Sequence, residues 1–589
     1  MIKRRYIMNV SIPRPEHPNP QMYRESWKSL NGEWLFCIDH GDSGEERKLY
    51  APENASAFSD RINVPFCPES ELSGIGIKDY MESVWYKRVL TFTDKELEGR
   101  VLLHFGAVDY HARLYVNGEF AGEHFGGFTH FCFDVTKLLH AGENDITLHA
   151  NDYVKDARQP SGKQSVKFYS ERCYYTRTTG IWQSVYVELV PREYIKSFKV
   201  YPDIENCSVA ISAELVGEGR LTATAYYEGK EVGCASKTGR GAMHLELPLS
   251  EKHLWEVGCG RLYDLELKFG DDSVKSYFGL REVRVDGLKV LINGKSVFQR
   301  TVLDQGFYPD GILTAPTKEA LERDIDLSLA VGFNGARLHQ KVFEPLYLYY
   351  ADKKGYLVWG EHASWPLDFT KEETLLSFLP EWCEAVEFDF NHPAIVGWCP
   401  LNETFKDPNK TYRQTVKAIY EATKRLDPTR PVIDSSGGLH VITDIYDMHN
   451  YNQDPVGFKR DWSKYNGTKE SLHIAPLQNI GKNVIIEGLP LFLSEIGGIK
   501  WVCESRRALV PEISWGYGNA PLTEEEFFSR YEGLIGAMTD SPSIMGFCYT
   551  QLTDVEQETN GIYNYDRSAK FADMSRIYAA NTKKALIED

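Results

Sequence analysis

The sequence of 589 residues predicts a multidomain protein in which two β-sandwiches precede a parallel α/β barrel. Two patterns support this prediction. Up to about residue 282, short runs of alternating apolar and polar residues are separated by turn residues, which is typical of antiparallel sheets. After about residue 283, helical stretches alternate with short apolar runs, which is typical of βα units. Roughly 300 residues remain there, enough for eight such units.

The first predicted domain, residues 1–193, is a β-sandwich. Asn117 and Gly118 predict a hairpin turn, because both residues tolerate a positive φ and strand-forming residues flank them. No long helical period interrupts this region. Its alternating runs include Val101–Phe105, Ala112–Val116 and Asp145–Ala150.

The second predicted domain, residues 194–282, continues the alternation in a shorter block whose size suits an immunoglobulin-like sandwich. It contains no cluster of polar residues that indicates chemistry, so we expect it to brace its neighbours. Its runs include Ser208–Ala213, Arg220–Tyr227 and Leu262–Leu267.

The third predicted domain, residues 283–589, is a (β/α)8 TIM barrel. The helical period is clear in three stretches, and short apolar runs lie between them. The helical stretches are Lys318–Ala330, Phe343–Lys354 and Tyr412–Leu426, and the apolar runs include Tyr356–Trp359 and Ile395–Trp398.

Composition narrows the classes of function. With 42% apolar and 25% charged residues the chain is globular, and a net charge of −18 disfavours a nucleic-acid or anionic-membrane partner. No apolar run is long enough to span a membrane, and the basic N-terminus reaches polar, proline-rich sequence too soon for a signal peptide. The 11 cysteines, odd in number and without a C-x-x-C pair, indicate neither zinc nor disulfides. We therefore expect a cytoplasmic protein.

Two glutamates are the strongest candidates for catalysis. Glu403 lies in the run 397–404 and Glu495 in the run 491–498, and each closes a short apolar stretch in the barrel region. Barrel enzymes place their chemistry at such strand ends. Hydrolysis of a glycosidic bond needs an acid for the leaving oxygen and a negative group facing the oxocarbenium ion, and two carboxylates supply both.

The neighbours of the two glutamates suggest different roles. Glu403 follows the run Trp398–Leu401, so desolvation is expected to raise its pKa and keep it protonated as the acid. Glu495 lies beside Ser494 and two glycines, whose hydroxyl and amides favour an ionised nucleophile. A separation of ~5 to 5.5 Å predicts retention and ~6.5 to 9.5 Å inversion, and the sequence leaves both open.

The chain resembles glycoside hydrolase family 2, the β-galactosidase, β-glucuronidase and β-mannosidase group, along essentially its whole length. The resemblance implies a jelly-roll sugar-binding domain, an immunoglobulin-like sandwich and a catalytic barrel, in that order. The motifs that carry it are Leu30–Trp34, Trp85–Tyr86, Thr178–Gln183, Gly332–His339 and Tyr356–Glu361.

The resemblance also implies roles for residues. The Asn402–Glu403 pair corresponds to the family's acid/base element and Glu495 to its retaining nucleophile. Asn402 is then expected to bind the sugar hydroxyl beside the anomeric carbon, a contact that strengthens in the transition state. Arg337 is expected to orient a carboxylate through paired hydrogen bonds. His339, His449 and Tyr451 are candidates for hydroxyl contacts or for orienting Glu495, and weaker candidates are Glu361, Trp365, Asp304 and Tyr549.

One departure from the family bears on the sugar. Family β-glucuronidases carry an Asn-x-Lys element that grips the sugar carboxylate, and the corresponding stretch here, Glu558–Tyr563, has no lysine. This lowers the expectation of a glucuronidase. Lys163 and Arg177 of the first domain are candidates to reach the active site, with surface charges as the alternative.

The sequence therefore predicts an exo-acting, retaining glycosidase of β-galactosidase type that acts on a small carbohydrate or glycoconjugate without a metal or other cofactor. The alternatives are a β-galactofuranosidase or an α-L-arabinofuranosidase or arabinopyranosidase, a β-glucuronidase or related uronidase, and a non-catalytic carbohydrate-binding protein. A homo-oligomer is possible, and its symmetry is not predictable.

Overall fold

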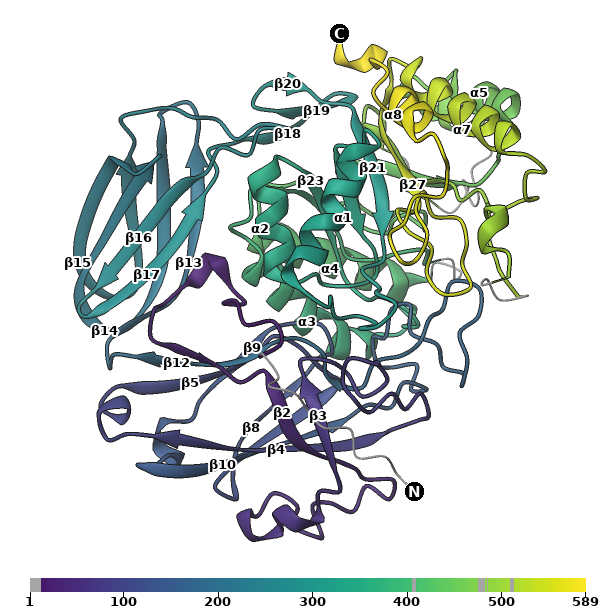
Figure 1. Ribbon diagram of the computed structural model, residues 1–589. Coiled ribbons are helices and arrows are strands. Elements are labelled where there is room, and N and C mark those ends of the chain that lie inside the picture. The colour runs from purple at the N-terminus through teal and green to yellow at the C-terminus, as the bar shows by residue number, and fades with distance from the viewer. Residues whose placement is uncertain (1–11, 405–408, 475–482, 485, 509–512) are drawn as a thin grey trace.

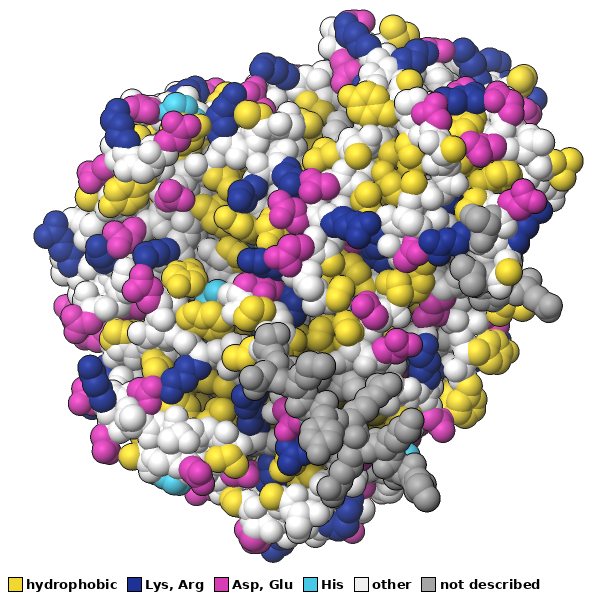
Figure 2. All heavy atoms as spheres, in the orientation of Figure 1, with side chains coloured by type: hydrophobic (Ala, Val, Ile, Leu, Met, Phe, Trp, Pro, Cys, Tyr) yellow, Lys and Arg dark blue, Asp and Glu magenta, His cyan; other side chains and the backbone are white. Residues whose placement is uncertain are grey.

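The structure is a computed structural model, and it describes residues 12–589 except 405–408, 475–482, 485 and 509–512. Figure 1 shows three parts: a β region at the bottom, a second β region at the left, and an α/β region at the centre and upper right. No helix among the described residues is long and apolar enough to cross a membrane. Acidic and basic side chains are interspersed over the face in Figure 2.

The first β region consists of antiparallel sheets, as predicted. A four-stranded sheet has the order β1-β12-β5-β9, a six-stranded sheet has the order β3-β2-β4-β10-β7-β8, and β6 pairs with β11. Asn117 and Gly118 have φ values of 53° and 81° and join β7 to β8, which confirms the predicted hairpin. The strands are β1 Trp27–Ser29, β2 Gly32–Ile38, β3 Asp60–Val64, β4 Ser83–Phe92, β5 Arg100–Phe105, β6 Val108–Asp109, β7 His111–Val116, β8 Glu119–Phe125, β9 Phe131–Asp134, β10 Gly142–Asn151, β11 Gly180–Ile181 and β12 Val185–Val190.

The second β region is joined by its hydrogen bonds into one five-stranded antiparallel sheet. Two runs that the sequence separates, 208–213 and 220–227, lie in a single long strand. Gly217, with φ 99°, lies at an irregularity of this strand and does not end it. The immunoglobulin-like arrangement therefore stays a prediction. The strands are β13 Tyr194–Asp203, β14 Ser208–Tyr227, β15 Lys230–Pro248, β16 Tyr263–Phe269 and β17 Asp272–Phe278.

The third region begins with a small antiparallel sheet and continues as a parallel sheet of seven strands in the order β24-β23-β22-β21-β27-β26-β25. This curled sheet fits the predicted barrel. The antiparallel strands are β18 Val283–Asp286, β19 Lys289–Ile292 and β20 Lys295–Ser296. The parallel strands are β21 Gln299–Asp304, β22 Gly335–Leu338, β23 Leu357–Glu361, β24 Ile395–Cys399, β25 Tyr446–Asn450, β26 Leu491–Gly497 and β27 Ile544–Thr550.

The segment 431–436 lies in the eighth position of the barrel, between β24 and β25. Val432 and Ser436 form parallel bridges with Trp398 and Asn402, on the β24 side. On the other side the hydroxyl of Ser436 donates to Asp447 of β25 at 2.6 Å. The barrel is therefore closed here by isolated bridges and side chains.

Helices cover the outside of the barrel (Figure 1). The predicted helical stretches are confirmed, and local signals set their ends: Thr317 caps α1, Pro345 opens α2, and Gly355 in the left-handed region ends it. The helices are α1 Lys318–Ala330, α2 Pro345–Lys354, α3 Thr374–Phe388, α4 Lys410–Leu426, α5 Pro455–Trp462, α6 Lys469–Ile474, α7 Glu524–Thr539 and α8 Ser575–Asn581.

The first β region packs directly on the barrel. Tyr175 and Trp182, both completely buried, belong to the same hydrophobic cluster as the barrel strands. Tyr175 lies in the long connection between β10 and β11, residues 152–179, which we call the sandwich loop, and Trp182 directly follows β11. The barrel thus packs against the segment that carries Tyr175 and Trp182, which lies more than a hundred residues before the barrel in the sequence.

Candidate active site

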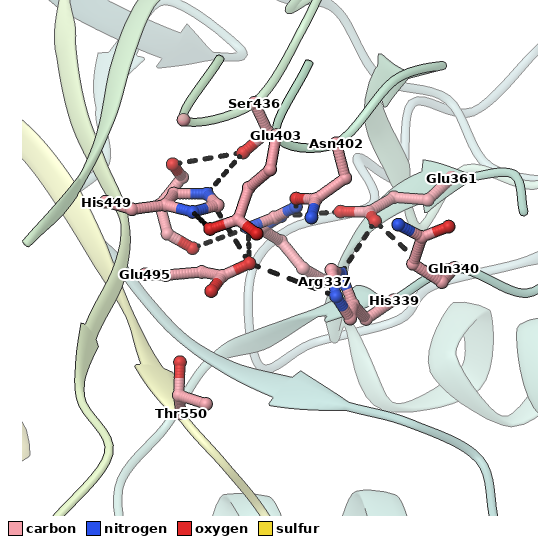
Figure 3. Close-up of polar contacts among 12 residues, drawn as sticks. Arg337, His339, Gln340, Glu361, Asn402, Glu403, Ser436, His449, Glu495 and Thr550 are labelled. Atoms are coloured by element: carbon pink, nitrogen blue, oxygen red, sulfur yellow. Dashed lines mark hydrogen bonds and ion pairs between the residues drawn. The ribbon is translucent and has the colours of Figure 1, made fainter. Parts of the chain in front are cut away.

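The carboxyl ends of neighbouring barrel strands bring the predicted polar residues together (Figure 3). Arg337 lies near the end of β22, Glu361 ends β23, Glu403 follows β24, His449 is in β25 and Glu495 is in β26. All five side chains belong to one network of hydrogen bonds and ion pairs. The sequence alone placed Glu403 and Glu495 at strand ends, whereas Arg337, Glu361 and His449 were candidates through the resemblance to the family.

Glu495 is held on both of its carboxylate oxygens. Oε1 lies 3.3 Å from Nη1 of Arg337 and 3.4 Å from Nε2 of His449. Oε2 accepts a hydrogen bond from the hydroxyl of Tyr451, whose ring stacks on Tyr517 at 3.4 Å. The side chain of Glu495 is only 4% exposed. These contacts fix the orientation of the carboxylate, as the predictions for Arg337 and Tyr451 require.

Glu403 and His449 form a close pair. Nδ1 of His449 lies 2.8 Å from Oε1 of Glu403, whose side chain is 21% exposed. Burial acts to lower the pKa of His449, but the negative charges of Glu495 and Glu403 outweigh burial and raise it. The imidazole therefore favours its protonated form.

The expectation that Glu403 has a raised pKa is wrong. Burial does act to raise the pKa, but the hydrogen bond and charge of His449, with the charges of Lys163 and Arg337, hold it below its usual value. The apolar neighbours in sequence could not reveal a histidine that comes from another strand. In the free protein the shared proton therefore lies on the histidine side of the Glu403–His449 pair.

Arg337 connects the glutamates to the floor of the site. Its guanidinium donates to Oε1 of Glu361 at 2.5 Å, to the carbonyl of Ser494 at 2.7 Å and to Oδ1 of Asn402 at 3.3 Å. Glu361 also contacts Nδ1 of His339 at 3.1 Å. Burial, with the charge of Lys163, lowers the pKa of His339 well below its usual range, so this imidazole is neutral.

Asn402 presents an unused amide. Its Oδ1 accepts from Arg337, while its Nδ2 is buried and has no hydrogen-bond partner among the described residues. The indole of Trp365 donates to the backbone carbonyl of Asn402 at 2.9 Å. Trp365 therefore positions Asn402, and among the described residues its indole donates no hydrogen bond to either glutamate.

The structure places two predicted residues outside this network. The carboxylate of Asp304 accepts from the amide of Gly306 at 2.9 Å and from the hydroxyl of Tyr347 at 3.3 Å. Tyr549 is fully buried, and its ring packs on Tyr531 at 5.0 Å. Within the described part of the chain, neither side chain has a hydrogen bond or ion pair to Glu403 or Glu495.

Sequence reasoning missed Ser436 and Asp447 as supporting residues, and the hydroxyl of Ser494, expected to favour an ionised Glu495, donates to Asp447. Ser436 contacts His449 at 3.0 Å and accepts the backbone amide of Glu403 on its carbonyl at 2.8 Å. Ser494 and Ser436 both donate to Asp447. The segment that carries Ser436 has only two apolar residues before it turns polar, so no strand signal marked it.

The sandwich loop borders the site. The amides of Ser161 and Gly162 donate to the carbonyl of Trp365 at 2.8 and 2.9 Å. The ammonium of Lys163 lies 4.1 Å from the centre of the Trp365 ring, whereas Arg177 donates to backbone carbonyls within the first β region. Neither residue is a surface charge, since they are 7% and 2% exposed.

The site also contains a set of groups able to bind a cation. A carboxylate oxygen of Glu403, a ring nitrogen of His449 and a carboxylate oxygen of Glu495 lie within 4.8 Å of one another. The same three side chains hydrogen-bond one another or pair as ions. The expectation that no metal is required therefore stays a prediction.

Comparison with known protein families gives two matches. Residues 27–187 match the model of the sugar binding domain of glycosyl hydrolases family 2, and residues 283–480 match the TIM barrel domain of the same family. The two models together cover more than half of the chain. They match the first β region and the barrel.

Similar proteins carry glycosidase names. A β-glucuronidase from Paenibacillus borealis is 23% identical over 70% of this chain and 74% of its own length, and a β-galactosidase from Leuconostoc mesenteroides is 25% identical over 75% of this chain but only 46% of its own length. Among solved structures, a Lactobacillus rhamnosus β-glucuronidase has a TM-score of 0.77 at 20% identity, covering 96% of this chain and 99% of that one. This likeness shows the same fold.

Proposed function

The chain belongs to glycoside hydrolase family 2 and is an O-glycosyl hydrolase, and on this premise we propose that it is an exo-acting, retaining glycosidase that releases a terminal uronic acid from a small β-glycoside. Retention requires a carboxylate that reaches the anomeric carbon directly, with no room for a water molecule beneath the sugar. The retaining mechanism and the identity of the released sugar are supported by different observations.

The observation that carries the mechanism is the closeness of Glu403 and Glu495. An oxygen of each lies within 4.8 Å of the other, near the ~5 to 5.5 Å of retaining glycosidases and below the ~6.5 to 9.5 Å of inverting ones. Glu495 is buried and doubly held, as a nucleophile requires, whereas Glu403 is the more exposed of the two. This difference supports Glu403 as the acid that meets the leaving group.

The reaction then has two displacements. In the first, an oxygen of Glu495 attacks the anomeric carbon, the bond to the leaving oxygen breaks, and that oxygen takes the proton held by the Glu403–His449 pair. In the second, Glu403 removes a proton from water, the hydroxide oxygen bonds to the anomeric carbon, and Glu495 leaves. Asn402 supplies its free amide to the hydroxyl beside the anomeric carbon.

The names of the relatives favour a uronide over a galactoside. Relatives called β-glucuronidase come from Paenibacillus borealis and from Felis catus, the second at 26% identity over 71% of this chain. The sandwich loop supports exo action, because it lies against Trp365 and closes one edge of the site to a longer sugar chain.

The second candidate is a neutral β-galactoside, and the stretch after β27 favours it. In this stretch the amide of Asn560 donates to Glu558 at 2.8 Å, and the next lysine along the chain, Lys570, donates to Asp554 at 2.5 Å. This loop therefore presents no free ammonium to a sugar carboxylate.

Initial rates on nitrophenyl glycosides test the proposal. The panel contains the β-glucuronide, β-galactoside, β-mannoside, β-galactofuranoside, α-L-arabinofuranoside and α-L-arabinopyranoside. We expect the uronide to be hydrolysed fastest, with net retention seen by NMR of the first product, and Glu495→Gln to abolish turnover.

A higher rate on a galactoside or furanoside than on the uronide would overturn the assignment of the sugar and leave the mechanism standing. Turnover unchanged in Glu495→Gln would overturn the nucleophile, and sugar binding without any turnover would favour the non-catalytic alternative.

A further inference from the structure

Lys163 is a buried lysine that has no ion-pair partner among the described residues. It is 7% exposed, and within the described residues no hydrogen bond or ion pair joins its ammonium to another side chain. Its ammonium lies over the face of Trp365, 4.1 Å from the ring centre. Burial of an ammonium is costly unless negative groups nearby offset it.

The negative groups near Lys163 are those of the active site. Burial acts to lower the pKa of Lys163, but the proximity of Cys173 and the charges of Glu495 and Glu558 raise it, so the ammonium is charged at neutral pH. The described carboxylates nevertheless lie beyond 4.0 Å from it, since no ion pair forms. The ammonium is thus close to the reacting groups and still available to a ligand.

We propose that Lys163 binds the carboxylate of the terminal uronic acid and thereby makes the enzyme selective for uronides. This inference rests on the proposed function and names the group that would carry its sugar specificity. The geometry is unusual in that the lysine comes from the first β region and not from the barrel. It supplies the cation that the Glu558–Tyr563 stretch lacks.

The sandwich loop holds Lys163 in place by contacts on both sides of it. Before it, the amide of Gly162 donates to Trp365; after it, the backbone carbonyl of Lys163 accepts the amide of Tyr175 at 2.8 Å. The hydroxyl of Tyr175 in turn donates to Glu558 at 2.5 Å. A charged group fixed in advance in this way loses little entropy when a ligand binds.

The other charged groups near the site are already engaged. Arg337 donates to Glu361, Asn402 and the carbonyl of Ser494, in addition to its contact with Glu495. A uronate carboxylate would have to displace one of these contacts to bind there. Lys163 needs no such exchange.

Matched substrate pairs test the inference. 4-Nitrophenyl β-D-glucuronide and β-D-glucoside differ only at carbon 6, as do the β-D-galacturonide and β-D-galactoside. Lys163→Met keeps the length of the side chain and removes the charge, and Lys163→Arg keeps the charge. Lys167→Met is the control, because Lys167 lies on the same loop, is 46% exposed and pairs with Glu171.

We expect Lys163→Met to lower kcat/KM for the uronide of each pair about 10- to 100-fold, the usual effect of losing a hydrogen bond to a charged group. The neutral partner should change less than about 3-fold. Lys163→Arg should keep the preference for the uronide, and Lys167→Met should change neither rate. Thermal unfolding checks that each variant is folded.

Three outcomes would overturn the inference, and they are distinguishable. An equal loss on both members of a pair would mean that Lys163 only balances the charge of the glutamates. A uronide preference that survives in Lys163→Met would reject Lys163 and leave the proposed function standing. A wild-type enzyme that prefers the neutral member of each pair would reject both the uronide assignment and this role.

Discussion

His449 is the residue on which the chemistry of the site converges, because it contacts both glutamates. Its Nδ1 lies 2.8 Å from Glu403 and its Nε2 3.4 Å from Glu495. The pKa of Glu403 is lowered and that of His449 is raised, so the two groups titrate as a pair that keeps one proton. In the proposed mechanism, the acid of the first displacement is therefore this pair and not Glu403 alone.

The pH profile of a His449→Gln variant tests this view. In the wild type the pair keeps its proton until the pH exceeds the raised pKa of His449, so kcat/KM should fall on the alkaline side above 6.5. In the variant the proton must reside on Glu403, whose ordinary pKa is 4.5; burial acts to raise this pKa, and the charges of Lys163 and Arg337 still act to lower it. We expect the alkaline limb to move to lower pH. His253→Gln, in the second β region, is the control, and an unmoved limb in His449→Gln would contradict the shared proton.

Asn402 offers a second test at this scale. Its buried and unpartnered Nδ2 should gain a hydrogen bond to the sugar hydroxyl that strengthens in the transition state. We expect Asn402→Ala to lower kcat/KM about 10²- to 10³-fold on a normal glycoside and to have little effect on the matching 2-deoxy glycoside. Equal losses on both substrates would show that Asn402 acts only through the position of Arg337.

At the scale of elements, the alternation of side chains along a barrel strand decides which predictions of site residues succeed. Glu361 and Glu495 face the barrel interior, as their contacts with Arg337 show. Asp304 and Tyr549 also end strands, but they contact Tyr347 of α2 and Tyr531 of α7, so they face the helix layer. The end of a strand can be recognised in the sequence. Which of its side chains point into the barrel cannot be recognised when the apolar run is continuous, because both faces of the strand are then apolar.

Dependence on local sequence patterns also explains which other site residues could be predicted and which could not. Glu403 and Glu495 were predictable because each closes a strong apolar run. Ser436 was not, because the eighth barrel position is held by isolated bridges. Lys163 was a candidate to reach the site, with a surface charge as the alternative. The sequence could not decide between the two, because the approach depends on a loop that docks from another region and no local pattern encodes such a contact.

Gly162 tests whether the sandwich loop must dock closely. Its φ is 61°, and an added Cβ would lie 2.5 Å from the carbonyl oxygen of Gln340. Gly74, with φ 81°, has nothing within 4 Å of such a Cβ, so Gly74→Ala suffers the same backbone strain of ~1 to 2 kcal/mol without the clash. We expect Gly162→Ala to lower kcat/KM by about 10² while Gly74→Ala keeps it. Similar activity in both variants would mean that the loop is not part of the working site.

At the scale of the whole molecule, buried hydrogen bonds and ion pairs of arginines join the three regions. Arg281, after β17, donates to the carbonyls of Pro393 and Ile395 of the barrel region at 2.6 and 2.7 Å. Arg24, ahead of β1, donates to Glu188 of the first β region and to Asp272 of the second, each at 2.9 Å. The regions that carry the site are thus held in register by arginines near their boundaries.

Arg24→Met tests whether this joint is needed for stability. The arginine and its two partners are each less than 5% exposed. Removal of the guanidinium would leave the buried carboxylate of Asp272 without its cation and Glu188 with His104, at 3.2 Å, in place of the arginine. Such a loss typically destabilises by ~3 to 5 kcal/mol. We expect the urea midpoint of the first unfolding transition to fall. The two β regions can then unfold in separate transitions, so the unfolding curves measured by fluorescence and by circular dichroism should no longer coincide.

Arg61→Met is the control, because Arg61 and Glu33 are 62% and 46% exposed and such surface pairs contribute less than ~1 kcal/mol. Equal midpoints for the two variants would mean that packing at the interface, and not the ion pairs of Arg24, holds the two β regions together.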